Sequence, residues 1–556
     1  MKVLFLGGDD RSGLATVRSL AKEKCKVDFF GLSQHSVVSH SKYVEKHYFL
    51  NTDKVDELRF HILELLSNGK YDLVLPGDDV FCHLLDSDID AYERFAKVSL
   101  PGKRLFKVLS DKQLLINVSN KLKILTPETK IINKGSQVND FPVSKITFPV
   151  YAKPRYSVLI YQGKIQTTCV KKLHNSEQLL KYLSDYMGRV DVLLQNSVPG
   201  FGKSAYIFAV EGKVISISCQ TRLHEPENGG GSSYRSSSKV DSYMLDSSIR
   251  IVSHYGWTGP IMIEYKYDPE SNKYYIMEIN ARLWGSLALT INSGHNIPKY
   301  IYEYFSRGIV PKPNKPIAGL TQRHLINDIG WLYRKKKGVL EYFLWIGSFK
   351  RIFYGKEFLD VEKKEDFMPA IWSYFYFLKH KLNQINRITG ILLSSISFLY
   401  IFQVKNKKRL IKVFKEKKVN NILFVCRGNI ARSAYCENWA KNHILNCNFL
   451  SAGTLGLEGR YAHPEILNIV ANDNFHSHSS VALSSIKKDW PDLIFIMDAK
   501  NLYEIKSFDF YSNLIFPLSC LSTLNQIKDP DKMDLKKIPE TISIIENNLR
   551  QLEKFF

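Results

Sequence analysis

Cysteine is scarce in this chain, with eight residues among 556, no Cys-x2-Cys pair and no regular spacing. This scarcity argues against a disulfide framework or a structural zinc site and favours a reducing compartment. The start, MKVLFLGG, lacks the charged leader and cleavage site of a signal peptide, so we expect a cytoplasmic protein. The uncharged stretch 388–404 has only 17 residues, whereas a bilayer span needs about 20 apolar ones. We expect a buried or interfacial helix there.

Acidic residues are outnumbered, with 55 Asp and Glu against 77 Lys and Arg, and the formal net charge is +22. The excess is concentrated in residues 331–418, which hold 20 basic and 7 acidic side chains, a difference of +13. This segment is also rich in aromatics, as in WSYFYF at 372–377. Basic and aromatic residues together suit a membrane surface or a nucleic-acid backbone, but a helical region with an aromatic core and a solvated basic face is the simpler explanation. We expect no specific nucleic acid partner and leave contact with the inner-membrane surface open.

The chain is too long for one hydrophobic core, because single cores stop growing at about 250–300 residues. Its N-terminal part alternates apolar strands (KVLFLG, VDFFGLS, YDLVLP) with helical patterns, and GGDDRSG follows the first strand. This alternation is typical of a parallel α/β sheet. Hairpin-like strands follow, then a helical basic region that ends in a charged linker at 405–418. We predict four domains, at 1–104, 105–330, 331–418 and 419–556.

A first set of polar residues suits a metal and phosphates. Lys153 ends an apolar strand, and a turn at DPESNK separates the strand that carries Glu264 from the strand that carries Glu278 and Asn280. If the two strands form a hairpin, side chains of equal parity share a face, so Glu264 faces Glu278 and Asn280. Two carboxylates and an amide oxygen make a hard oxygen site that suits Mg²⁺ beside nucleotide phosphates. Arg282 follows and is placed to neutralise phosphate charge.

These residues resemble the ATP-grasp superfamily of ligases, and the resemblance covers about residues 1–330. It implies a Rossmann-like leading domain, two lobes that hold ATP, and an activity that joins a carboxylate to an amine or thiol. The implied cofactors are ATP and Mg²⁺, with Mn²⁺ as an alternative metal. By motif position the resemblance assigns ATP binding to Lys112, Lys153, Gln195, Asn196, Val198, Arg222 and Arg282, and metal binding to Glu264, Glu278 and Asn280. A non-catalytic nucleotide-binding module that regulates or localises the rest of the chain stays open as an alternative.

A second motif, CRGNIARS, directly follows the apolar strand NILFVC. A strand, a short loop and a helix at this spacing point backbone N–H groups inward at a helix N-terminus, which makes an anion site. Such a setting favours the thiolate of Cys426. Arg432 can donate two hydrogen bonds to a phosphoryl group, and Gly428 and Asn429 tolerate the left-handed angles of a tight loop.

This motif resembles the signature of the low-molecular-weight protein tyrosine phosphatases, C-x-G-N-x-x-R-S, and the resemblance covers about residues 420–556. SAGT, PDLIFIMD and KDPD follow in family order. The resemblance implies a phosphocysteine intermediate and no cofactor. It assigns catalysis to Cys426, Arg432 and Asp529, and the phosphate-binding loop to Arg427, Gly428, Asn429, Ile430, Ala431 and Ser433. An arsenate reductase of the same fold is a lesser alternative, because only Cys447 and Cys520, widely separated, follow Cys436.

The predicted fold class is therefore α/β and multidomain. It comprises a Rossmann-like domain, a two-lobed ATP-grasp fold, a helical basic linker and a doubly wound parallel-sheet phosphatase domain. The predicted function is a bifunctional enzyme, a ligase joined to a protein tyrosine phosphatase. Its expected partners are small-molecule carboxylate and amine substrates and a phosphotyrosine protein or a small phosphomonoester.

Overall fold

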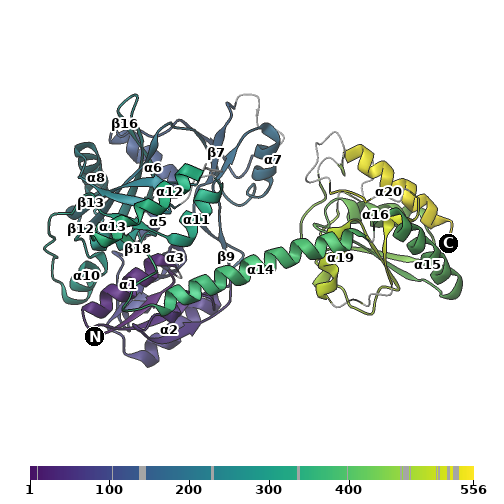
Figure 1. Cartoon of the computed structure of the whole chain (residues 1–556), viewed down its shortest axis with the longest axis horizontal. Helices are drawn as coiled ribbons and strands as arrows, with labels where there is room; N and C mark the ends of the chain where they lie inside the picture. The colour runs from purple at the N-terminus through teal and green to yellow at the C-terminus, as the bar shows by residue number, and fades with distance from the viewer. Residues whose placement is uncertain are drawn as a thin grey trace. The chain divides into compact units, whose positions relative to one another are not determined.

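The computed structural model divides into two compact units, Met1–Phe377 and Leu378–Phe556 (Figure 1). It describes residues 1–8, 10–102, 104–136, 146–226, 231–334, 339–396, 398–463, 466–467, 475, 477–508, 510, 514–522, 526–529 and 538–556. The finer division into four domains remains a prediction.

The first unit begins with the parallel α/β arrangement that the sequence predicts. Five parallel strands pair in the order β3-β2-β1-β4-β5. The central strands are apolar along their length because helices cover both faces, as expected of a parallel sheet. The strands are β1 Lys2–Leu6, β2 Lys26–Gly31, β3 Val44–Phe49, β4 Leu73–Pro76 and β5 Lys97–Val98, and the helices are α1 Arg11–Lys22, η1 Val38–His40, α2 Val55–Gly69, α3 Asp79–Ser87, α4 Ile89–Glu93, α5 Leu105–Leu109 and α6 Lys112–Lys121.

A smaller antiparallel sheet follows, in the order β10-β7-β11-β6, with α7 packed on it. Its alternating apolar residues, such as Val150, Ala152, Val192 and Leu194, are buried against α7. Beside it lies the hairpin of β8 and β9. The elements are β6 Thr129–Ile132, β7 Val150–Pro154, β8 Val158–Tyr161, β9 Lys164–Thr167, β10 Lys171–Leu173, α7 Ser176–Ser184 and β11 Val192–Asn196.

A seven-stranded sheet, β16-β15-β12-β13-β14-β17-β18, completes the first unit. Strand β12 alternates between its two faces: Ala205 and Ile207 join the core that contains α8, whereas Tyr206 and Phe208 join the core that contains α1, α9 and α10. The elements are β12 Phe201–Val210, β13 Lys213–His224, β14 Tyr234–Ser238, α8 Ser242–Tyr255, β15 Gly259–Asp268, β16 Lys273–Asn280, α9 Leu287–Asn292, α10 Ile297–Ile301, η4 Tyr302–Ser306, β17 Thr321–Arg323 and β18 Glu357–Leu359.

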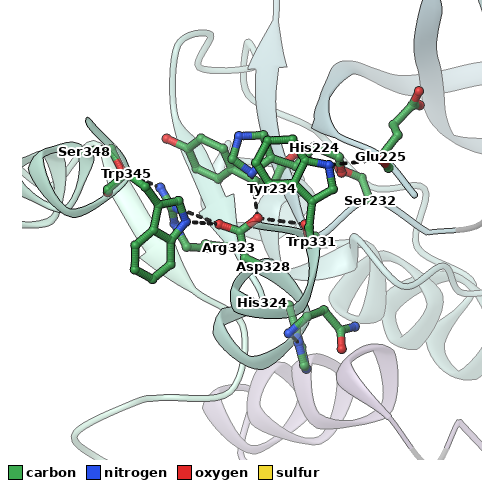
Figure 2. A network of polar contacts seen from close by, with 12 residues as sticks. His224, Glu225, Ser232, Tyr234, Arg323, His324, Asp328, Trp331, Trp345 and Ser348 are labelled. Atoms are coloured by element: carbon green, nitrogen blue, oxygen red, sulfur yellow. Dashed lines mark hydrogen bonds and ion pairs between the residues drawn. The ribbon is translucent and has the colours of Figure 1, made fainter. Parts of the chain in front are cut away.

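A buried ion pair joins the β14–β17 end of this sheet to the helices after it (Figure 2). Arg323 and Asp328 are both fully buried, and the Asp328 carboxylate also accepts hydrogen bonds from Ser233 Oγ at 2.7 Å and Trp345 Nε1 at 2.6 Å. His224 Nδ1 lies 2.6 Å from the same carboxylate. Burial disfavours the charged form of Asp328, but the effect of these donors is larger and holds the pKa of Asp328 below its usual range. The network therefore fixes β14 and β17 firmly to each other.

The basic region 331–418 is largely helical, although it also contains β18. Its helices are α11 Leu325–Arg334, α12 Val339–Ser348, α13 Lys350–Phe353, α14 Met368–Ile396 and α15 Tyr400–Glu416. The stretch 388–404, expected to form one helix, is divided between α14 and α15. Within the described ranges, no helix is both long enough and apolar enough to cross a membrane.

The second unit has a parallel sheet in the order β20-β19-β21-β22. The segment 405–418, expected to be a linker, mostly forms α15 instead, because Leu410 is buried in this unit's core and Lys407 Nζ donates to the Leu521 carbonyl at 2.7 Å. The elements are β19 Asn421–Cys426, α16 Arg432–His443, β20 Asn448–Gly453, η5 Leu483–Ser485, β21 Leu493–Ile496, α19 Ala499–Ile505, η6 Lys506–Phe508, β22 Ile515–Pro517, η8 Leu518–Cys520 and α20 Ile538–Glu553.

Candidate active sites

The predicted metal ligands lie on a hairpin of β15 and β16. The two strands are antiparallel, and the register places Glu264 directly opposite Glu278. Asn280, two residues further along β16, donates from Nδ2 to Glu264 Oε1 at 3.3 Å. Among the described residues, no group of three or more His, Cys, Asp or Glu side chains is placed to hold a metal ion. The two carboxylates and the amide nevertheless supply hard oxygen atoms on one face, and this donor set fits Mg²⁺ or Mn²⁺ if phosphates and water complete the shell.

Two lysines approach this hairpin. Lys112 begins α6, and its Nζ lies 3.6 Å from Glu278 Oε1 and 2.8 Å from Ser157 Oγ. Lys153, on β7, is only 9% exposed. Burial lowers the pKa of Lys153. The negative charge of Glu278 opposes this shift, and the positive charge of Lys112 adds to it. Glu278 is thus the carboxylate nearest both ammonium groups, and two positive charges beside one carboxylate suit an added anion such as a nucleotide phosphate.

Two arginines also contact the hairpin residues. Arg222, on β13, donates to Glu264 Oε2 at 2.6 Å. Arg282 donates from Nε to Asp79 Oδ2 at 2.8 Å and from Nη2 to Asn280 Oδ1 at 3.1 Å. Arg282 therefore ties the hairpin to α3 of the N-terminal sheet. Asp79 is a functional candidate that the sequence analysis did not identify, although its position at the start of the helix that follows strand β4 of a parallel sheet is a usable signal.

The predicted adenine-binding residues lie at and after the end of β11, which pairs with β7, the strand of Lys153. The Asn196 backbone N–H donates to the Glu128 carbonyl at 2.9 Å, and its side chain donates to the Glu128 carboxylate at 2.9 Å. Gln195 is buried and donates from Nε2 to Thr129 Oγ1 at 3.3 Å. Asn196 lines a cavity of about 80 Å³, well below the roughly 300–1,000 Å³ of typical ligand pockets. Val198 is not among the residues lining that cavity. The adenine assignment of these three residues stays a prediction.

In the second unit, Cys426 ends β19 and is nearly buried. Its sulfur accepts hydrogen bonds from the Asn429 backbone N–H at 3.3 Å and from Ser433 Oγ at 3.0 Å. Ser433 and Arg432 occupy the first turn of α16, so the helix N-terminus also points toward the sulfur. Hydrogen bonds and the helix dipole both favour a negative charge there.

Asn429 shapes the loop around that sulfur. Its φ is +52°, in the left-handed region that Asn tolerates better than most residues. Its side chain donates to Ser433 Oγ at 3.0 Å and to Ser451 Oγ at 2.7 Å, and accepts from the Val481 N–H at 2.7 Å. The remaining predicted loop residues, Arg427, Gly428, Ile430 and Ala431, lie between the strand and the helix as expected.

Arg432 is almost completely buried and lies between two acids. Its Nη1 is 2.6 Å from Asp498 Oδ2, and its Nη2 is 3.1 Å from Asp529 Oδ2. Burial opposes the charge, but Asp498, Asp529 and Cys426 together raise the pKa of Arg432. The structure thus brings Asp529 to the arginine, while residues 530–531 of the KDPD motif lie outside the described part. The sequence analysis assigned no role to Asp498, although it ends the quoted PDLIFIMD run.

The other thiols of this unit are less suited to redox chemistry. Burial raises the pKa of Cys436 well above its usual value and that of Cys520 to about 12. Burial also raises the pKa of Cys447, to about 11. A thiol that passes on a disulfide reacts as the thiolate, so this arrangement speaks against the arsenate reductase alternative.

Comparison with protein families agrees with both motif sets. Residues 421–555 match the family model described as low molecular weight phosphotyrosine protein phosphatase. Residues 189–326 match the model described as ATP-grasp in the biosynthetic pathway with Ter operon.

Among solved structures, the chain is similar to an L-amino acid ligase from Bacillus licheniformis, with 14% identity, coverage of 58% of this chain and 78% of that chain, and a TM-score of 0.45. It is also similar to N5-carboxyaminoimidazole synthetase from Staphylococcus aureus, with 13% identity, 56% and 79% coverage and a TM-score of 0.43. A biotin carboxylase from Campylobacter jejuni gives 13% identity, 58% and 74% coverage and a TM-score of 0.45. At these values the likenesses identify no substrate for this chain. The family matches show that the chain joins an ATP-grasp ligase domain, matched over 189–326, to a low molecular weight phosphotyrosine phosphatase domain, matched over 421–555.

Proposed function

We propose that the second unit hydrolyses phosphotyrosine or a small phosphomonoester through a phosphocysteine. The Cys426 sulfur attacks phosphorus, and the S–P bond forms as the bond to the leaving oxygen breaks. Asp529 gives its proton to that oxygen, and Arg432 donates to the equatorial oxygens. Water then attacks the phosphocysteine, the S–P bond breaks, and inorganic phosphate leaves while Asp529 recovers the proton.

The observation that carries this proposal is the pair of hydrogen bonds on the Cys426 sulfur, from the Asn429 N–H and Ser433. Hydrolysis of para-nitrophenyl phosphate tests it. Cys426→Ser should abolish turnover, and Cys447→Ser, at a partly exposed thiol outside the loop, should not. Turnover that persists in Cys426→Ser would refute the proposal.

We propose that the first unit is an ATP- and Mg²⁺-dependent ligase that joins a carboxylate to an amine or thiol. Glu264, Glu278 and Asn280 would hold the metal, which would supply positive charge to the phosphates. Lys112, Lys153, Arg222 and Arg282 would bind the phosphates and orient them toward the carboxylate. The adenine would lie against Gln195, Asn196 and the Val198 backbone.

The observation that supports the ligase proposal is the convergence of Lys112 and the buried Lys153 on Glu278. Calorimetry should detect Mg-ATP binding that Glu278→Ala weakens, and a screen of acids with amines should detect ADP release. Binding without ADP release for any pair would favour the alternative, a nucleotide-binding module that regulates or localises the phosphatase. Equal binding by wild type and Glu278→Ala would refute the metal assignment.

We also propose that the basic region meets an anionic membrane surface from the cytoplasmic side. Helix α12 exposes Leu340, Phe343 and Leu344, each more than 60% accessible, and the segment around it carries the chain's excess of positive charge. Apolar side chains and basic groups on one helical region suit an interfacial position. Flotation with anionic and neutral vesicles tests this. Protein that stays in the dense fraction with both kinds of vesicle would refute it.

A further inference from the structure

A buried arginine in the first unit has donors that nothing in the described part of the chain satisfies. Arg235, on β14, is 2% exposed. Its Nη2 donates to Asp360 Oδ1, but its Nε and Nη1 are buried without a hydrogen-bond partner among the described residues. Burial accordingly lowers the pKa of Arg235, although Asp360 opposes that effect. Buried charged donors are normally paired, and none of the described residues supplies an acceptor for these two, so the guanidinium is free to bind an added anion.

A neighbouring side chain repeats the pattern. Gln322 pairs with Arg235 across β14 and β17, so the two side chains share one face of the sheet. Gln322 is fully buried, and its Oε1 accepts from Asn292 at 2.9 Å. Its Nε2 has no partner in the described part. Three unsatisfied donors therefore belong to two adjacent residues, and an oxyanion is the group that accepts several hydrogen bonds at once.

The loop motif GGDDRSG, which follows β1, brings a second guanidinium to the same place. Arg11 Nη1 lies 3.4 Å from Asp360 Oδ2 and 3.3 Å from the Ser232 carbonyl. Glycines at 231 and 285 make room for it, because a Cβ at either position would come within 3.1–3.2 Å of Arg11 Nη2. A single carboxylate, that of Asp360, is thus shared by two arginines.

The other titratable groups nearby do not supply the missing acceptor. Burial, reinforced by the charge of Arg11, lowers the pKa of His324 to about 4, so this ring is neutral at pH 7. Its one acceptor nitrogen, Nδ1, already accepts from the Asn327 N–H at 3.2 Å. Figure 2 shows His324 on the side of the Arg323–Asp328 network that faces away from Trp345. The carboxylate of Asp10 is turned to the start of α1, where it accepts from the Ser12 N–H at 3.0 Å and from Ser12 Oγ at 2.9 Å.

The sheet also fixes where this group lies relative to the predicted phosphate site. Arg235 is the cross-strand neighbour of Arg222, which contacts Glu264. From the strand of Glu264 to the strand of Arg235 the order is β15, β12, β13, β14. Three strand spacings make roughly 14 Å. An anionic group bound by Arg235 would therefore lie apart from the substrate carboxylate that reacts with the γ-phosphate of ATP.

We propose that Arg235, with Arg11 and Gln322, binds a second anionic group of the ligase's small-molecule substrate, at the end remote from the reacting carboxylate. The substrate class is thus an acid that carries an additional carboxylate or a comparable oxyanion. This inference rests on the proposed ligase function only in taking the first unit to bind a substrate.

The test uses the full-length protein with Cys426→Ser, which removes the phosphatase nucleophile. Calorimetry measures binding of malonate, succinate, glutarate, L-aspartate and L-glutamate, each beside its ω-monoamide, in the presence of Mg-ADP. At least one diacid should bind tenfold or more tightly than its amide. Arg235→Gln and Arg11→Gln should each reduce that ratio to near one. Arg250→Gln, on α8 at the opposite face of the sheet, is the matched control and should keep the ratio.

The outcome is decisive in either direction. If no diacid binds better than its amide, or if the preference survives in both Arg235→Gln and Arg11→Gln, the inference is wrong. Because Arg11 is partly exposed, its variant keeps the test valid should the buried Arg235→Gln fail to fold. Mg-ATP binding is measured in the same samples. Its absence would refute the ligase proposal while the comparison of acid with amide still decides the anion site.

Discussion

The hydroxyl of Ser433 offers the sharpest test of the phosphatase chemistry. Its Oγ donates to the Cys426 sulfur at 3.0 Å inside a buried loop. A hydrogen bond to a charged group contributes about 1.5–3 kcal/mol, and 1.36 kcal/mol corresponds to a factor of ten in rate. We therefore expect Ser433→Ala to lower kcat/KM for para-nitrophenyl phosphate by about 10-fold to 150-fold. The loop itself should survive, because the Asn429 amide that Ser433 accepts from also donates to Ser451 at 2.7 Å.

A second readout and a matched control separate this effect from general damage. The rate at which iodoacetate alkylates Cys426 at pH 6, followed by mass spectrometry, should fall together with kcat/KM, because both depend on the charged sulfur. Ser519 is also a buried serine of this unit, and its hydroxyl has no partner within the described ranges. Ser519→Ala should therefore retain wild-type kinetics. A Ser433→Ala enzyme within threefold of wild type in both measurements would show that this hydroxyl does not stabilise the sulfur.

Three further predictions follow from the geometry. Glu278→Gln should weaken Mg-ATP binding at least tenfold in calorimetry, because it removes the carboxylate nearest the two site lysines; unchanged affinity would contradict this. Asp328→Asn should lower the free energy of unfolding of the first unit by about 3–5 kcal/mol in urea, since it breaks a buried ion pair. The pKa of Asp328 is depressed by folding, so its stabilisation is present above about pH 4 and is lost as the pH falls further, and the variant should lack that acid-induced loss. Gly390→Ala should increase hydrogen exchange in α14, because the new Cβ would lie 2.2 Å from the ring of Tyr503, whereas Gly347→Ala, with nothing within 4 Å, should not increase exchange in α12.

The two sites differ in how much of their geometry is local. The eight-residue phosphatase motif, 426–433, runs from the end of a strand into the first turn of a helix, so the spacing of Cys426, Asn429 and Ser433 already determines that their polar atoms meet. The hairpin of Glu264 and Glu278 is similarly local, because strand parity alone sets which side chains share a face. These features, and the matches to two families, were predictable from the sequence.

The partners of these groups come from distant segments. Asp498 and Asp529 reach Arg432 from loops 66 and 97 residues away in the chain, and Asp360 meets Arg235 from 125 residues away. The sequence around a carboxylate does not indicate which distant arginine the carboxylate will contact. Only the packing of strands and helices brings such pairs together and excludes the water that would otherwise screen them.

The sequence alone thus determined the two families and the local shape of each motif, because spacing within a strand, loop or helix fixes side-chain direction over short distances. Tertiary structure decided which buried donors have no partner among the described residues, such as Nε and Nη1 of Arg235, and which charged segments fold. Residues 405–418 illustrate the second point. Their charge density suggested a linker, but the burial of Leu410 makes them a packed helix. Whether a side chain is buried depends on which distant segments pack against it, and local composition does not indicate which segments these are.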